Sequence, residues 1–155
     1  MFIYWTSWIE YSCGQQTAST ASQKVVIAIF RVYLVDNSEL ELQMTETAFA
    51  QLEKDVKIVG TSTCSETAMK EILDLKPNLV ITDLYMRQMG GIGLMNALKA
   101  AGADCEFIIL SHSWSPEAMR KFIQSGGYDF LLKPLDLHDF QTVLRELQRG
   151  FKLRS

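Results

Sequence analysis

The stretch that decides the fold is Asn78-Leu79-Val80-Ile81-Thr82-Asp83, an apolar run that ends on a single carboxylate. Leu84-Tyr85-Met86 follows, and then the turn sequence Met89-Gly90-Gly91. A short apolar run bounded by turn residues predicts a strand that is buried on both faces. In an open α/β sheet, such a strand presents the residue at its carboxyl end to the cleft where ligands bind. Asp83 is therefore the first candidate functional residue.

Three further apolar runs end on a polar residue in the same way. Asp36 closes the run 31–35, Ser111 closes 107–110, and Lys133 closes 130–132. Because parallel strands end at one edge of their sheet, we expect these side chains to lie close to Asp83. Each residue taken alone also fits a simpler role as a turn, a cap or a solvated surface group. Because all four apolar runs end on such a residue, a functional site explains the pattern better than four separate minor roles.

Helical patterns separate these runs. We expect helices over 38–55, 65–75, 92–101, from Ser115 to the glycines at 126–127, and around Leu137–Leu147, with one more short strand at 56–60. Strands that alternate with helices through short connections predict a parallel sheet covered on both faces. The expected fold class is therefore α/β, a flavodoxin-like, doubly wound sheet of five parallel strands with five helices.

Length and composition exclude several classes of protein. The 155 residues suit one domain, and a content of 48% hydrophobic and 21% charged residues is ordinary for a globular protein. The net charge is −3 and no run of Lys and Arg appears, which argues against a nucleic-acid-binding surface. No apolar segment is long enough to span a bilayer.

The first thirty residues differ from the rest. Residues 1–11 are rich in aromatic side chains, and 12–23 are rich in Ser, Thr and Gln. We interpret 1–30 as a flexible N-terminal extension, while a tail that binds a partner or touches a membrane remains the alternative. The domain is then expected over 31–150, followed by a C-terminal tail at 151–155.

These motifs together resemble the receiver domain of bacterial response regulators, including its single-domain, chemotaxis-type members. The resemblance runs from Arg31 to about Gly150. It is carried by Leu34-Val35-Asp36-Asn37, by Asp83-Leu84-Tyr85-Met86 with Gly91, by Ser111, and by Gly126 through Phe130-Leu131-Leu132-Lys133-Pro134. It implies the strand order 2-1-3-4-5.

The resemblance also implies a chemistry. Asp83 would take a phosphoryl group from a histidine kinase or a phosphotransfer protein, Lys133 would pair with the phosphoryl oxygens, and Ser111 would hydrogen-bond one of them. Mg²⁺ would neutralise the repulsion between the two anions, held by Asp36, Asn37, Asp83 and the backbone carbonyl of Tyr85. The Lys133–Pro134 bond is a candidate cis peptide.

The output of such a domain would be a conformational switch. The ring of Phe130 would move inward when Ser111 shifts, and this would remodel the surface formed by the fourth helix, the fifth strand and the fifth helix. A downstream protein would bind there, and a homodimer stays open. Little chain follows the last helix, so we expect a stand-alone cytoplasmic receiver that signals through protein contacts rather than an enzyme.

Three positions depart from the family pattern. Asn37 stands where a second acid is usual, which removes one anionic ligand from a hard dication unless another acid, such as Glu39, supplies the charge. Arg87 follows Met86, and His112 follows Ser111. Asn37 favours the alternative of a degenerate receiver that works unphosphorylated. A flavodoxin or a haloacid-dehalogenase-type phosphatase is disfavoured, because Asn37-Ser38-Glu39 is neither a phosphate loop nor the acid motif of such phosphatases.

Overall fold

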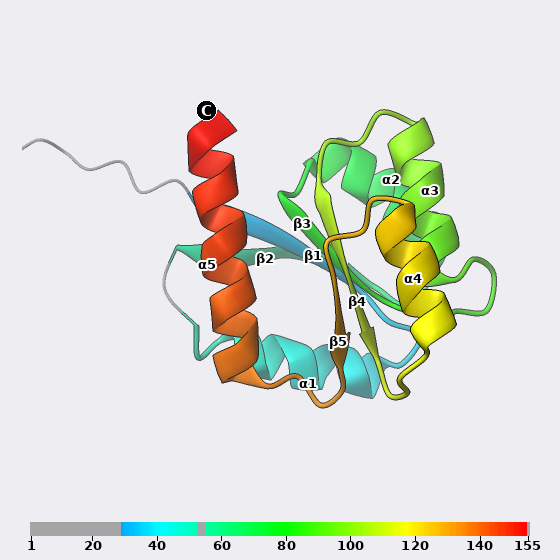
Figure 1. The fold of residues 1–155 in the computed structure, drawn as a ribbon, viewed down its shortest axis with the longest axis horizontal. Helices are drawn as coiled ribbons and strands as arrows, with labels where there is room; N and C mark the ends of the chain where they lie inside the picture. The colour runs from blue at the N-terminus through cyan, green and yellow to red at the C-terminus, as the bar shows by residue number, and fades with distance from the viewer. Residues whose placement is uncertain (1–28, 53–54, 155) are drawn as a thin grey trace, which may run out of the picture.

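The computed structural model describes residues 29–52 and 55–154 (Figure 1). Most of the predicted N-terminal extension, residues 1–28, lies outside them. Strands and helices alternate along the described chain: β1 (Phe30–Val35), α1 (Glu39–Phe49), β2 (Val56–Ser62), α2 (Ser65–Leu75), β3 (Leu79–Asp83), α3 (Gly91–Ala100), β4 (Glu106–Ser111), α4 (Pro116–Gln124), β5 (Asp129–Leu132) and α5 (Leu137–Arg154). No helix among these is long and apolar enough to cross a membrane.

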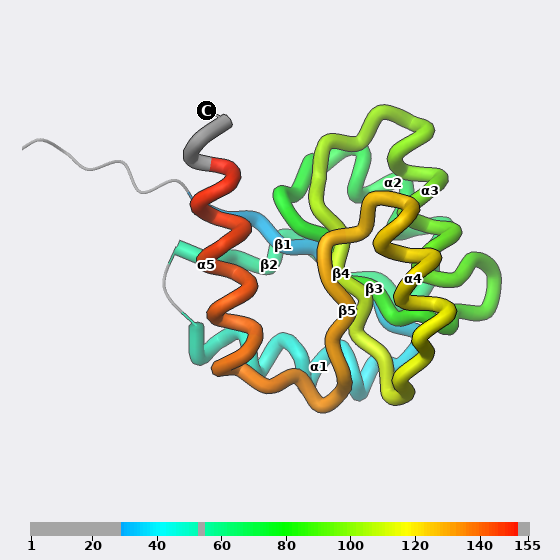
Figure 2. Tube along the Cα trace, in the orientation of Figure 1, coloured from blue at the N-terminus to red at the C-terminus, as the bar shows by residue number. Residues whose placement is uncertain are grey.

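The five strands form one parallel sheet in the order β2-β1-β3-β4-β5. Figures 1 and 2 show α1 and α5 grouped away from α2, α3 and α4, so that the two helix groups cover opposite faces of the sheet. This is the doubly wound, flavodoxin-like fold that the sequence predicts, with the expected strand order.

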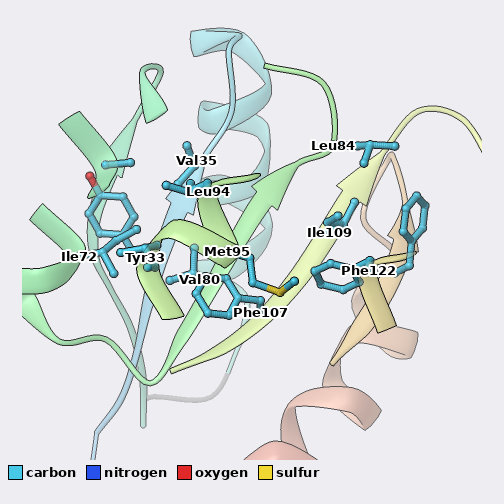
Figure 3. Close-up of a cluster of buried hydrophobic side chains, with 13 residues drawn as sticks. Tyr33, Val35, Ile72, Val80, Leu84, Leu94, Met95, Phe107, Ile109 and Phe122 are labelled. Atoms are coloured by element: carbon cyan, nitrogen blue, oxygen red, sulfur yellow. The ribbon is translucent and has the colours of Figure 1, made fainter. Parts of the chain in front are cut away.

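Alternation along the strands divides the buried side chains between two cores. One core joins Tyr33, Val80 and Ile109 to helices α2, α3 and α4, and Figure 3 shows its side chains. The other core joins the strand residues next to these in the sequence to α1 and α5. It includes Val32, Leu34, Leu79, Ile81, Ile108, Leu110, Phe140, Leu144 and Leu147. Because successive strand residues point to opposite faces, an almost continuous apolar run is what a sheet covered on both sides requires.

Capping residues fix where the helices begin. Ser38 accepts a hydrogen bond from the N–H of Glu41 at 3.3 Å, and Ser115 accepts one from Ala118 at 3.2 Å, with Pro116 in the first turn of α4. Both starts agree with the sequence. Helix α1 ends at Phe49, earlier than the predicted limit at residue 55. After its C-cap residue the backbone hydrogen bonds join residues three apart instead of four, including Leu52 N–H to the Phe49 carbonyl at 2.9 Å, so the chain leaves the α-helix in a tighter turn.

Both predicted domain boundaries need correction. The sequence pattern puts Phe30 in the extension, yet this residue begins β1 and is buried. The pattern puts Phe151 in the tail, yet α5 continues to Arg154. The two rings meet edge to face, with their centroids 5.5 Å apart. Each boundary residue therefore has an apolar partner that lies at the far end of the sequence, where a local pattern does not reveal it.

Candidate functional site at the carboxyl edge of the sheet

Strand register brings the polar strand ends together. Asp83 pairs with Leu110, and Ser111 pairs with Leu132, so that neighbouring strands finish at the same level. The backbone N–H of Asp36 donates to the Ser62 carbonyl at 3.1 Å, which extends β1 along β2. The N–H of Lys133 donates to the Ser111 carbonyl at 2.9 Å.

The ammonium of Lys133 lies among three carboxylates. It donates a hydrogen bond to Asp36, and it lies 3.9 Å from Asp83 Oδ2 and 3.8 Å from Glu41 Oε2. The Lys133 side chain is only 2% exposed. A buried ammonium of this kind requires anionic partners, and here they are the residue after β1, a residue of α1 and the last residue of β3. The Lys133–Pro134 peptide bond is cis, as predicted.

The pKa of the Asp83 carboxyl is raised above its ordinary value. Burial is the main cause, and the negative charge of Asp36 raises it further, while Lys133 and backbone N–H groups work in the opposite direction. Asp83 is thus a partly desolvated carboxylate that shares a single ammonium with other acids. Perturbation by burial together with specific charges is typical of functional sites.

A close backbone contact holds the acid in place. Gly91 begins α3 and packs directly on Asp83, where an added Cβ would clash with the Asp83 carbonyl oxygen. The N–H of Gly91 also donates to the Leu84 carbonyl at 3.1 Å. Only glycine allows this approach, so the Gly90-Gly91 turn fixes the position of the β3 end.

Further oxygen donors lie near Asp83. The Asn37 amide donates to the Tyr85 carbonyl at 3.0 Å, so that these two predicted metal ligands lie side by side. Asp36 accepts the Ser38 N–H at 2.9 Å through Oδ1. Two carboxylates, a carbonyl and an amide are the kind of oxygen donors that Mg²⁺ binds, so the residues present fit that ion.

The hydroxyl candidate ends β4, and the aromatic candidate lies in the neighbouring strand β5. Ser111 is buried, and its Oγ accepts the Ser113 N–H at 3.4 Å. The Phe130 ring is also buried and meets the exposed ring of Trp114 edge to face at 5.9 Å. We expected this ring to move inward on switching, whereas it is already inward in this structure.

The residues that depart from the family pattern lie around the site. Arg87 is exposed on the loop after β3. His112 is 67% exposed, and its Nε2 lies 3.3 Å from Glu41 Oε1. Glu41 is the residue that sequence reasoning missed. Glu39 was our candidate for an acid that compensates for Asn37, but Glu39 is exposed and Glu41 contacts Lys133. The sequence feature that could have identified Glu41 is its place in the first turn of the helix after Asp36.

The fold and these residues define a class of protein. A family model described as the response regulator receiver domain matches residues 32–145. The chain belongs to this family, a signalling domain of two-component systems for which aspartate phosphorylation and magnesium are typical.

Curated relatives and solved structures agree with this assignment. The chain is 26% identical over 120 residues to the probable C4-dicarboxylate response regulator DctR of Bacillus subtilis, covering 77% of this chain and 53% of that protein. The chain spans about half the length of the first curated relatives that it matches. Solved structures share the fold. One is the receiver domain of the putative response regulator NarL from Mycobacterium tuberculosis, with a TM-score of 0.71 and 22% identity, covering 78% of this chain and 98% of that one. Another is the CheX-CheY-BeF3-Mg+2 complex from Borrelia burgdorferi, with a TM-score of 0.70 and 20% identity, covering 77% of this chain and 90% of that one.

Proposed function

We propose that this protein is a receiver that is phosphorylated on Asp83 and signals through protein contacts. One observation carries the proposal: a partly desolvated carboxylate ends β3 beside a buried ammonium that it shares with Asp36. Burial raises the free energy of the anion, which makes the oxygen a better nucleophile than a fully hydrated carboxylate.

The transfer step follows from this arrangement. An Asp83 oxygen attacks the phosphorus of a phosphohistidine on a kinase or a phosphotransfer protein. The new O–P bond forms while the P–N bond breaks, and the electron pair stays on the imidazole nitrogen. Lys133 would then pair with a phosphoryl oxygen as a compact point charge, and the Ser111 hydroxyl would donate to another.

Mg²⁺ is the cofactor that the donor set supports. Asp36, Asp83, the Tyr85 carbonyl and the Asn37 amide oxygen would hold it, and when bound it supplies positive charge that offsets the repulsion between carboxylate and phosphoryl group. The Borrelia burgdorferi complex combines BeF3 with Mg, which supports the same use in a protein of this fold.

The output surface that we propose comprises α4, β5 and α5. Exposed apolar side chains support it: Trp114, Ile123, Tyr128 and Leu132 lie on or beside α4 and β5. A downstream protein would bury them, and Trp114 would transmit a change at the site because its ring contacts Phe130. We place this activity in the cytoplasm, where the receiver would signal through its contacts with a partner protein.

A degenerate receiver is the second candidate function, and a specific contact favours it. The Asn37 amide donates to the Tyr85 carbonyl, which is an oxygen that the metal would use. A neutral side chain that satisfies this carbonyl weakens the need for a cation. In that case the fold would bind its partner without phosphorylation.

Incubation with acetyl phosphate and Mg²⁺ separates the two candidates. We expect the intact protein to gain the mass of one phosphoryl group, and the Asp83→Asn variant to gain none. A wild-type protein that gains no mass, although it is folded and has been supplied with saturating Mg²⁺, would favour the degenerate receiver.

A further inference from the structure

We propose that Glu41 is a positioning residue that holds Lys133 and the loop between β4 and α4 in the arrangement that this unphosphorylated structure shows. The inference rests on the proposed function, because it gives Glu41 a part in the response to phosphorylation of Asp83. Glu41 lies in the first turn of α1 and is not among the ligands or phosphoryl-contacting groups assigned above.

The two oxygens of Glu41 contact two different elements. Oε1 lies 3.3 Å from Nε2 of His112, in the loop after β4, and Oε2 lies 3.8 Å from Nζ of Lys133, at the end of β5. The side chain of Glu41 is 24% exposed, so solvent only partly screens its charge. A single carboxylate therefore links α1 to Lys133 and to the residue next to Ser111, the two phosphoryl-contacting groups proposed above.

Both contacts oppose the phosphorylated arrangement. Lys133 now bonds Asp36 and lies 3.9 Å from Asp83, so pairing with phosphoryl oxygens would compete with the contacts that it makes here. Any attraction toward Glu41 favours the present position. Ser111 must also approach the phosphoryl group, and His112 is the next residue along the chain. Contacts made in one state and lost in the other bias the equilibrium toward the first.

Charge adds to this bias. Asp36, Glu41 and Asp83 place three carboxylates around the Lys133 ammonium. A phosphoryl group brings further negative charge. The carboxylate of Glu41 therefore disfavours the phosphoryl group directly, although the same charge favours a divalent cation. The two effects can be separated by working at saturating Mg²⁺.

The first test reads Lys133 in the resting protein. Buried ammonium groups give side-chain NMR signals, and the Lys133→Met variant identifies the signal of Lys133 by its loss. In Glu41→Gln we expect this signal to shift and to exchange faster with water. Glu46→Gln, which removes an equal charge from an exposed site on the same helix, should leave it in place. An unmoved signal in Glu41→Gln would overturn the inference.

The second test uses beryllofluoride as the phosphoryl mimic, at saturating Mg²⁺. In a Trp5→Phe, Trp8→Phe background, Trp114 is the remaining tryptophan and reports binding. Glu41→Gln should bind beryllofluoride about fivefold more tightly, the upper range for losing one partly exposed ion pair, and Glu46→Gln should match its parent. Equal or weaker binding by Glu41→Gln would overturn the inference. If the parent itself does not respond, the proposed function fails, and the Lys133 signal alone decides the role of Glu41.

Discussion

Burial has opposite effects in the two apolar cores and at the charged edge of the sheet. In the cores, side chains such as Phe107 and Phe140 are fully buried among apolar neighbours. At the edge, Asp36, Asp83 and Lys133 are also largely buried, but each depends on charged neighbours. Burial stabilises the first region and raises the free energy of the carboxylates in the second.

This difference separates stability from reactivity. The pKa of Asp83 is raised mainly by burial, so the ionised acid disfavours the folded state at neutral pH. The cores must offset that cost. The protein thus keeps a partly desolvated set of charges at one end of a sheet whose remaining length is apolar. Truncations in the cores should therefore lower stability, whereas at the edge the direction should depend on whether the variant removes the ammonium or a carboxylate.

The largest effect is expected in the core. Phe107→Ala removes a fully buried ring from β4 and should lower the free energy of unfolding by about 3–5 kcal/mol, since the surrounding atoms collapse only in part. Urea unfolding followed by circular dichroism measures this. Ile123→Ala, at an exposed position on α4, should change stability by no more than about 0.5 kcal/mol. Equal losses in both variants would contradict the assignment of the core.

Lys133→Met should destabilise the protein through charge. The variant leaves Asp36, Asp83 and Glu41 without their shared ammonium, and we expect a loss of roughly 2 kcal/mol, less than for a sealed buried pair because water reaches Asp83 and Glu41. Mg²⁺ should restore more stability to this variant than to the wild type. Thermal unfolding with and without Mg²⁺ gives the comparison, with the exposed Lys121→Met as control. A variant that Mg²⁺ does not rescue would place the ion elsewhere.

Asn37→Asp should strengthen the edge as a cation site. A third carboxylate in the donor set, beside the Tyr85 carbonyl, should tighten Mg²⁺ binding by about tenfold and speed phosphoryl uptake. Asn96→Asp adds the same charge at an exposed position on α3 and should leave binding unchanged. Calorimetric titration measures both. A wild-type protein that already binds as tightly as Asn37→Asp would mean that Glu41 supplies the missing charge.

Asp83→Asn should give the smallest effect, a gain in stability. The raised pKa of Asp83 means that the unfolded chain loses this proton at lower pH than the folded protein does. Stability of the wild type therefore falls as pH rises through that window, and the cost is fully present above it. The gain of Asp83→Asn should be visible in urea at pH 7 and should vanish as pH falls below the ordinary value of 3.8. A gain that is independent of pH would have another cause.

The sequence predicts the strands and the edge of the sheet, but it misses contacts between residues that are distant in the chain. Apolar runs that end on Asp83, Ser111 and Lys133 were sufficient to predict the sheet and the edge where these residues meet, because strand periodicity is local. The contact between Phe30 and Phe151 was missed, since it joins the two ends of the described chain. Glu41 was missed for a related reason: its partners follow two strands that are distant in the sequence, and only the assembled edge distinguishes it from Glu39.

The most direct measurement identifies the residue that accepts the phosphoryl group. After reaction with acetyl phosphate and Mg²⁺, borohydride reduces an acyl phosphate to the corresponding alcohol, which converts the modified aspartate to homoserine, and peptide mass spectrometry locates it. We predict conversion at Asp83 and none at Asp36, although both are buried beside Lys133. Conversion at Asp36, or at neither residue while beryllofluoride also fails to bind, would contradict the central claim that the end of β3 is the phosphoacceptor.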